Sequence, residues 1–343
     1  MPAAPAASTS PPLALTMGEP AGVGAEITLA AWTRRRDSAV PPFVLLDDVD
    51  RIEAMARRLG WSVPVARVDH PREALPRFAE ALPVLHRPLP VPVEPGRPDP
   101  ANAGAVRDGI AEAVTLVRQG ECAAVVTNPI NKDVLQGAGF VFPGHTEFLA
   151  ELAGGEGRAV MMLACPGLRV VPITVHIPLS RVAATLTTEA IVDAGRVTAR
   201  ALARDFGLAA PRLAVAALNP HAGEHGRMGD EETRIIQPAV DLLRAEGLAV
   251  FDPSPADTLF HAGARAGYDA VLCMYHDQAL IPLKTIDFAG GVNVTLGLPF
   301  VRTSPDHGTA FDIAGQGRAN PMSLIAALRM AAVMAARRGA TAP

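Results

Sequence analysis

Aromatic side chains are scarce in this sequence. Two tryptophans, two tyrosines and eleven phenylalanines make up 4% of its 343 residues, although 49% of the residues are hydrophobic. The core must therefore consist mainly of Ala, Val and Leu, which suits helices packed on a parallel sheet better than a β-sandwich. The length is sufficient for two domains with substantial cores.

Cysteine is scarcer still. The three thiols, Cys122, Cys165 and Cys273, stand singly in apolar stretches. Such a sparse, odd set argues against a disulfide framework and indicates buried thiols in a reducing compartment. We therefore expect a cytoplasmic protein.

Long charged runs and long apolar runs are absent as well. The net charge is −4 and the densest basic cluster is Arg34-Arg35-Arg36, which argues against nucleic acid or an anionic membrane as the main partner. No run of about 18 apolar residues occurs, so no membrane span is expected. Residues 1–12 lack the basic and apolar regions of a secretory signal, and their composition predicts a disordered tail.

What is present is an alternation of short apolar runs with helical patterns, which predicts an α/β fold. Prolines recur from residue 83 to residue 100, which excludes a helix there and predicts a long extended loop. Strands are expected at residues 13–17, 43–46, 123–126, 160–164, 168–175, 213–218 and 271–275, and helices from residue 27 and at residues 52–59, 102–119, 191–206, 235–243 and 322–338.

Three of the expected strands are followed by a histidine: His176, His221 and His276. Ligands of open α/β sheets collect at the carboxyl ends of the strands, and neutral imidazole is the commonest metal ligand in proteins. Any one of these histidines alone is more often a hydrogen-bonded structural residue. The repeated pattern supports a shared metal site and separate structural roles equally.

Other polar groups stand at element boundaries. His145 and Thr146 open an expected helix, where backbone N–H groups can hold a phosphate; alternatively Thr146 is only an N-cap. Residues 18–26 form a glycine-rich turn, which favours close approach of a ligand or is simply a tight turn. This turn lacks the third glycine of the dinucleotide fingerprint. Asp257 is expected as a helix cap or a nearby acid.

Residues 13–338 resemble the 4-hydroxythreonine-4-phosphate dehydrogenase family of vitamin B6 biosynthesis. Residues 307–321 also resemble the cofactor loop of isopropylmalate and isocitrate dehydrogenases, whose fold this family shares. Six collinear blocks carry the first resemblance: Gly18-Glu19-Pro20-Ala21-Gly22, Gly144-His145-Thr146-Glu147-Phe148, His176-Ile177-Pro178-Leu179, Asn219-Pro220-His221-Ala222-Gly223-Glu224, Tyr275-His276-Asp277-Gln278 and the segment 293–302.

The resemblance implies a reaction. 4-Phosphooxy-L-threonine is oxidised at C3 with NAD or NADP to 2-amino-3-oxo-4-phosphooxybutanoate, which loses CO2 to give 3-amino-2-oxopropyl phosphate. It also implies two α/β/α domains around a central cleft, and a homodimer whose site is shared between the subunits. One divalent metal (Zn, Co or Mg) is then held by His176 and His221 of one subunit and His276 of the other.

The resemblance further implies roles for individual residues. Lys284, Asp277 and Asp257 correspond to catalytic groups, with Lys284 a hypothetical proton shuttle. Substrate contacts correspond to His145, Thr146, Lys284, Asn293 and Arg302, and cofactor contacts to His307, Gly308, Asp312 and Gly315. Asp312 is either a partner for ribose hydroxyls, which favours NAD, or an ordinary turn acid.

The expected chemistry agrees with those roles. A divalent cation stabilises a developing alkoxide and polarises the ketone that loses CO2, and three imidazoles leave its coordination shell open. Lys284 or Arg302 would neutralise phosphate or carboxylate. The cofactor domain is expected at residues 13–130 with 286–343, and the substrate, metal and dimerisation domain at residues 131–285.

Two segments depart from the family pattern: Val23-Gly24-Ala25-Glu26, and Asn128-Pro129-Ile130-Asn131-Lys132. The second puts some loop contacts near the substrate in doubt. Competing hypotheses are a paralogous dehydrogenase of D-threonate or D-erythronate 4-phosphate, a metal-dependent hydrolase, and a non-catalytic phosphate sensor. The loop at residues 307–321 argues against the last two.

Overall fold

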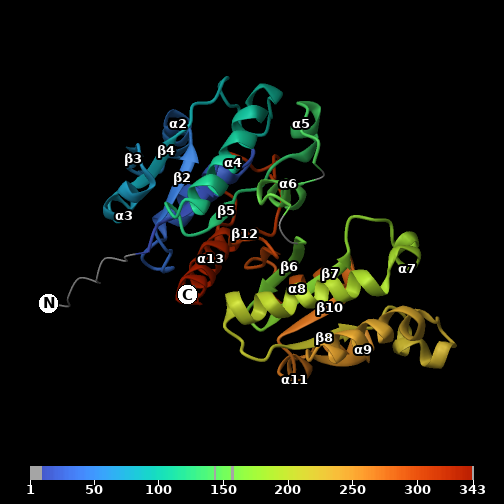
Figure 1. Ribbon diagram of the computed structural model, residues 1–343. Helices are drawn as coiled ribbons and strands as arrows, with labels where there is room; N and C mark the ends of the chain where they lie inside the picture. The colour runs from blue at the N-terminus through green and yellow to red at the C-terminus, as the bar shows by residue number, and fades with distance from the viewer. Residues whose placement is uncertain (1–9, 143, 156–157, 342–343) are drawn as a thin grey trace. The chain divides into compact units, whose positions relative to one another are not determined.

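The computed structural model describes residues 10–142, 144–155 and 158–341. They form two compact units (Figure 1). Unit 1 comprises the chain up to Leu152 together with Phe300–Ala336, and unit 2 comprises Ala153–Pro299 together with the chain from Arg337 onward. The predicted tail falls mainly on residues 1–9, which lie outside the described residues. The expected assignment of cofactor and substrate roles to domains stays a prediction.

Unit 1 holds strands in the order β3-β4-β2-β1-β5-β12, and neighbouring strands in this order are paired in parallel. This is the arrangement that alternating strands and helices predict. The strands are β1 (Leu13–Thr16), β2 (Phe43–Asp47), β3 (Val65–Val68), β4 (Leu82–His86), β5 (Val125–Thr127) and β12 (Arg302–Pro305). The helices are α1 (Gly24–Thr33), α2 (Val49–Leu59), α3 (Ala74–Arg77), α4 (Ala103–Arg118), α5 (Lys132–Gly137), α6 (His145–Leu152) and most of α13 (Met322–Thr341).

Unit 2 holds strands in the order β11-β6-β7-β10-β8-β9. They are β6 (Val160–Cys165), β7 (Leu168–Thr174), β8 (Arg212–Ala216), β9 (Ala249–Ser254), β10 (Ala270–Tyr275) and β11 (Val292–Leu296). Its helices are α7 (Val182–Thr185), α8 (Thr188–Phe206), α9 (Gln237–Ala245), α10 (Ala256–Leu259), α11 (Ala262–Arg265) and α12 (His276–Ile286).

The expectation of parallel strands is wrong at β6, which runs antiparallel to both β7 and β11. Only Pro166 and Gly167 separate β6 from β7, and Gly167 has a φ of 78°. A Pro-Gly pair between two apolar runs is a turn signal, with proline fixing one φ and glycine accepting a positive φ. The local sequence therefore contained the turn signal that indicates this hairpin.

The predicted loop from residue 83 is wrong for its first four residues, because these belong to β4. Pro83 lies opposite Ala66 of β3, while pairing with β2 begins one residue later, at Val84. Near the start of a strand the missing N–H of proline is tolerated. Residues 87–99 contain no helix and no strand of the sheet, as expected.

Helix ends follow their capping residues. The Asp48 side chain accepts hydrogen bonds from Asp50 N and Arg51 N, so α2 begins three residues before the periodic pattern suggests. Thr187 caps α8 in the same way, and Gly207 ends that helix in the left-handed conformation. α12 is absent from the predicted elements. Pro282 lies inside it, and an internal proline interrupts the helical pattern.

Among the described residues, no helix combines the length and the hydropathy that crossing a membrane requires.

Candidate active site

Two of the three predicted metal ligands meet at the carboxyl ends of neighbouring strands. β7 and β10 are paired in parallel, with Thr174 opposite Tyr275. His176 and His276 follow them, and their ring centroids are 5.9 Å apart. Both histidines line a cavity of about 280 Å³. The pairing of β7 with β10 thus brings these two strand-end histidines together within one chain.

The third predicted ligand, His221, follows β8, which pairs with the other edge of β10. His221 is exposed. Within the described part of this single chain, no three His, Cys, Asp or Glu side chains gather closely enough to hold a metal ion. A complete metal site therefore requires either a further ligand or a rearrangement of these side chains.

The backbone is strained at the predicted ligands. His176 has a φ of 52° and His221 a φ of 51°. A left-handed turn continues through the next four residues, which have φ values of 43° to 76°. Non-glycine residues adopt this region rarely, at a cost of about 1–3 kcal/mol each, and such strain gathers at functional sites.

A buried carboxylate, Glu232, accepts hydrogen bonds from the residues just before the left-handed turn. Glu232 accepts hydrogen bonds from Leu218 N at 2.8 Å and from Asn219 N at 2.7 Å. Its second oxygen accepts from Asn219 Nδ2 at 3.0 Å. Gly223 is required within the turn, because a Cβ there would lie 2.7 Å from Glu232 Oε2.

The predicted catalytic acids share one cavity of about 410 Å³ beside α10 and α12. Asp257 and Asp277 both line it, and both are exposed. Asp277 also contacts His276, with Oδ1 2.7 Å from Nδ1. The capping alternative for Asp257 is wrong, because Pro255 precedes α10 as its N-cap. Lys284 lies two turns along α12 from His276 and is half-buried, with Nζ 5.3 Å from the ring centroid of Phe288.

Unit 1 gathers positive charge around a neutral imidazole. Arg302 is buried on β12 and donates from Nη2 to Thr127 Oγ1 at 2.7 Å. Burial lowers the pKa of Arg302 to about 10, so the guanidinium stays charged at neutral pH. His145 is the first residue of α6, and its Nε2 is enclosed without a hydrogen-bond partner among the described residues. Burial, and then the charges of Arg302 and Lys132, hold the pKa of His145 well below its usual range.

The start of α6 differs from one of the two predicted alternatives, in which Thr146 is the N-cap. The Gly144 carbonyl accepts the hydrogen bond from Phe148 N, so Gly144 occupies the N-cap position and Thr146 is a helical residue rather than a cap. Neither Thr127 nor Lys132 was predicted from the sequence to take part in the site. Thr127 is the last residue of β5 and Lys132 is the first residue of α5, so the carboxyl end of β5 was the available signal.

The glycine-rich turn is explained by contacts within the chain. A Cβ on Gly22 would lie 3.0 Å from Thr309 O, and a Cβ on Gly24 would lie 2.7 Å from Met17 O. Glu26 is buried and accepts from Gly315 N at 3.0 Å and from Ala319 N at 2.8 Å. These contacts tie the turn to the loop at residues 307–321 and account for its glycines as the tight-turn alternative does; the ligand alternative stays a prediction.

The remaining predicted contacts are the four cofactor residues, which are at least partly accessible, and Asn293, whose side-chain oxygen is buried. His307, Gly308 and Asp312 are exposed, and Gly315 is half-buried. Asn293 lies on β11, where its Oδ1 is buried and has no hydrogen-bond partner among the described residues. A buried polar atom without a partner is unusual and marks a place for a ligand or water.

Solved structures define the class to which this arrangement belongs. The chain is 39% identical to 4-hydroxythreonine-4-phosphate dehydrogenase from Klebsiella pneumoniae, with a TM-score of 0.84 over 95% of this chain and 100% of that one. The enzyme of the same name from Burkholderia phymatum gives 37% identity and a TM-score of 0.80, over 95% and 99% of the two chains. Fold and sequence together place the chain among these α/β dehydrogenases.

The particular family follows from the sequence comparison. Residues 39–331 match the family model described as pyridoxal phosphate biosynthetic protein PdxA. A curated 4-hydroxythreonine-4-phosphate dehydrogenase from Methylorubrum populi is 58% identical over 339 residues, which is 96% of each chain. The chain belongs to the PdxA family. The resemblance predicted from the six sequence blocks is confirmed, and so is the α/β class.

Proposed function

We propose that this chain oxidises 4-phosphooxy-L-threonine with NAD or NADP to 2-amino-3-oxo-4-phosphooxybutanoate, which loses CO2 to form 3-amino-2-oxopropyl phosphate. Family membership supports the reaction class. The observation that carries the substrate assignment is the cluster of Arg302, Lys132 and the neutral His145. Such a cluster favours an anion that accepts several hydrogen bonds, as a phosphate does.

The proposed roles in phosphate binding follow from the charges. Arg302 supplies a permanent charge, and its contact with Thr127 fixes the direction of the guanidinium. The low pKa of His145 keeps the imidazole neutral before substrate binds, and its Nε2 can donate a hydrogen bond to a phosphate oxygen. Thr146, on the first turn of α6, offers a hydroxyl and a backbone N–H to the same group.

The donor set of unit 2 fits a divalent cation that prefers nitrogen. His176 and His221, with His276 of the partner subunit in the predicted homodimer, would hold it, and imidazoles suit Zn or Co better than Mg. When bound, the cation would supply Lewis-acid stabilisation of oxygen. The strained backbone at His176 and His221 supports this assignment. Such strain gathers at functional sites, whereas a histidine with a purely structural role can adopt a relaxed backbone.

Proton movement is proposed for α12. Oxidation removes a hydride from C3 and a proton from its hydroxyl, and we assign the proton to Lys284, with Asp277 and Asp257 as the nearby acids. Loss of CO2 then requires a proton at the carbon that held the carboxylate, and the same groups supply it. Asn293, whose buried Oδ1 lacks a partner, would accept a hydrogen bond from a substrate N–H or O–H group.

The predicted location is the cytoplasm. Cys122, Cys165 and Cys273 are buried and unbridged, which suits a reducing compartment.

A spectrophotometric assay tests the proposal. Purified protein receives 4-phosphooxy-L-threonine with NAD or NADP, first with a chelator and then with Zn, Co or Mg restored. We expect reduced nicotinamide only in the metal-restored samples. D-threonate and D-erythronate 4-phosphates serve as matched substrates; faster turnover of either would replace the proposed substrate with a paralogous one. Release of inorganic phosphate without reduced nicotinamide would indicate a hydrolase instead.

A further inference from the structure

The sheet hydrogen bonds between β8 and β10 end before the predicted metal ligands are reached. The last paired residues of this parallel ladder are Leu272 and Val215. His276 lies four residues beyond Leu272, and His221 lies six residues beyond Val215. The spacing of the two segments that present these histidines must therefore be held by contacts other than the ladder.

The carboxamide of Gln278 joins the two strand ends beyond the ladder. Continued by two residues, the register places Met274 opposite Ala217. Gln278 Oε1 accepts a hydrogen bond from Met274 N at 2.6 Å, and Gln278 Nε2 donates to Ala217 O at 2.7 Å. A single side chain thus bonds the backbone of β10 to the backbone that follows β8.

Burial makes these two hydrogen bonds difficult to replace. Gln278 is 7% exposed, and Met274 and Ala217 are buried as well. A backbone group that is buried without a partner has lost its hydrogen bonds to water and gains none in return. Gln278 is also the third residue of α12, so its side chain fixes the first turn of that helix, which contains His276, to the sheet.

A threonine extends the same linkage to β7. Thr174 Oγ1 donates to Met274 O at 2.8 Å, so side chains bond both the N–H and the carbonyl of Met274. Thr174 is the last residue of β7 and stands two residues before His176. The segments that lead to all three predicted ligands are therefore tied together through Met274.

A buried glutamine that pairs backbone groups can have a purely structural role, but two observations point beyond that role here. The backbone groups that Gln278 bonds stand two residues before His276 and four residues before His221. Glu232 accepts from the next two backbone N–H groups after Ala217, so the approach to the left-handed turn is held at consecutive positions. Residues that only orient metal ligands change metal affinity by about ten- to a hundredfold when they are replaced.

We propose that Gln278 is a positioning residue for metal binding, whose carboxamide sets the spacing between the backbone segments that present His276 and His221. This role rests on the proposed function for the identity of the ligand as a divalent cation. Gln278 itself contacts neither the metal nor the substrate in this role. In the predicted homodimer the two histidines serve different sites, so the loss of Gln278 weakens metal binding at both.

Titration of the purified full-length protein with zinc, against a competing chelator, tests the proposal without requiring turnover. Gln278→Met keeps the length of the side chain and removes both hydrogen bonds, so zinc binding should weaken by about tenfold or more. Gln278→Asn keeps the carboxamide on a shorter side chain that cannot reach both strands, and zinc binding should weaken by about threefold or more.

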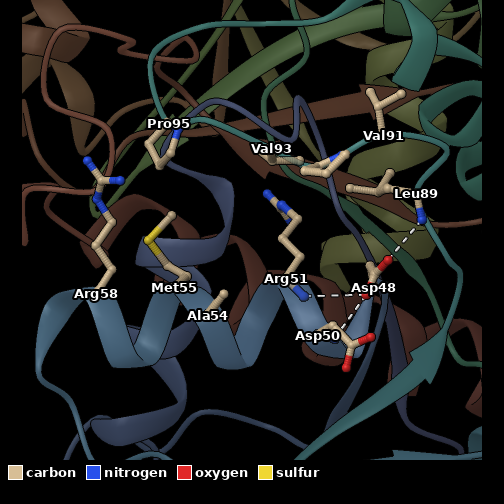
Figure 2. A pocket seen from close by; sticks show the side chains of 11 residues that line it. Asp48, Asp50, Arg51, Ala54, Met55, Arg58, Leu89, Val91, Val93 and Pro95 are labelled. Atoms are coloured by element: carbon tan, nitrogen blue, oxygen red, sulfur yellow. Dashed lines mark hydrogen bonds between the residues drawn. The ribbon is translucent and has the colours of Figure 1, made fainter.

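Asn102 offers a matched control in unit 1. Its buried carboxamide also accepts from one backbone N–H and donates to one backbone carbonyl, both of Val91, at 3.2 Å each. Figure 2 shows Val91 at a cavity of about 500 Å³ whose lining includes none of the predicted metal ligands. Asn102→Leu should lower the midpoint of urea denaturation, as Gln278→Met does, yet bind zinc as the wild type does.

The proposal is overturned if folded Gln278→Met binds zinc as tightly as the wild type, or no more weakly than Asn102→Leu. If Gln278→Met does not fold, Gln278→Asn decides by the same criterion. Either negative result leaves the dehydrogenase function intact, provided that the wild type binds zinc and reduces a nicotinamide cofactor. A wild type that binds no zinc would contradict both the metal role in the proposed function and the positioning role of Gln278.

Discussion

Glu232 accepts hydrogen bonds from both the backbone N–H and the side-chain amide of Asn219, at 2.7 and 3.0 Å. Asn219 stands two residues before His221, where the left-handed turn begins. A buried acid thus holds the strained segment that presents a predicted metal ligand.

Replacing Glu232 should therefore separate positioning from ligation. Glu232→Ala leaves the backbone N–H groups of Leu218 and Asn219 without their acceptor, which should cost about 1–3 kcal/mol of unfolding free energy and weaken zinc binding at least tenfold. Urea denaturation and zinc titration with a competing chelator measure the two effects. Glu246→Ala, an exposed acid of unit 2, is the control. Unchanged zinc affinity in Glu232→Ala would show that Glu232 does not position His221 for metal binding.

Arg302 should govern the affinity for phosphorylated substrate. Hydrogen bonds to charged groups contribute about 1.5–3 kcal/mol, so Arg302→Ala should raise KM by about tenfold or more. Arg302→Lys keeps the charge but loses the fork geometry and should recover only part of that loss. Inorganic phosphate should inhibit the wild type competitively and these variants much less. An unchanged KM in Arg302→Ala would show that the substrate phosphate binds elsewhere.

His145 should make folding stability depend on pH. The folded protein holds the pKa of His145 well below 6.5, whereas the unfolded chain restores a value near 6.5. Below this value the unfolded state binds the extra proton, so stability contributed by the neutral imidazole is complete above pH 6.5 and is lost progressively as the pH falls.

Denaturation by urea at pH 7.5 and pH 5.5 measures this effect. The wild type should lose more stability between the two values than His145→Gln does. His70→Gln serves as the control because His70 is exposed. Equal losses in wild type and His145→Gln would show that His145 is protonated as easily when folded as when unfolded.

Mixing variants tests whether the metal site is shared between subunits. His176→Ala and His276→Ala should each be inactive as homodimers. If His176 and His276 act from different subunits, random mixing restores about a quarter of the sites, because half of the dimers carry one intact site. The 5.9 Å separation of the two rings within one chain allows the opposite result. No recovery of activity in the mixture would show that His176 and His276 of one site come from a single subunit. His225→Ala, which removes an imidazole outside the predicted ligand set, is the control.

Much of the fold was predictable because the residues within each helix or strand largely determine that element. Apolar runs at β1, β2, β7, β8 and β10 lie within one or two residues of the predicted strands, since a buried parallel strand needs a short apolar run. The errors have local reasons too. A proline inside α12, a proline at the start of β4 and an unrecognised Pro-Gly turn after β6 each obscured the pattern.

The sequence alone determined which residues end the strands, and hence that His176, His221 and His276 were candidates. Only the tertiary structure decided that β7 pairs with β10, which places two of those imidazoles side by side. Only the tertiary structure placed the charges of Lys132 and Arg302 beside His145, and only it left a cavity between α2 and residues 89–95. Periodicity and capping act between residues a few positions apart, whereas strand order and the meeting of distant side chains depend on packing that no short stretch of the chain contains.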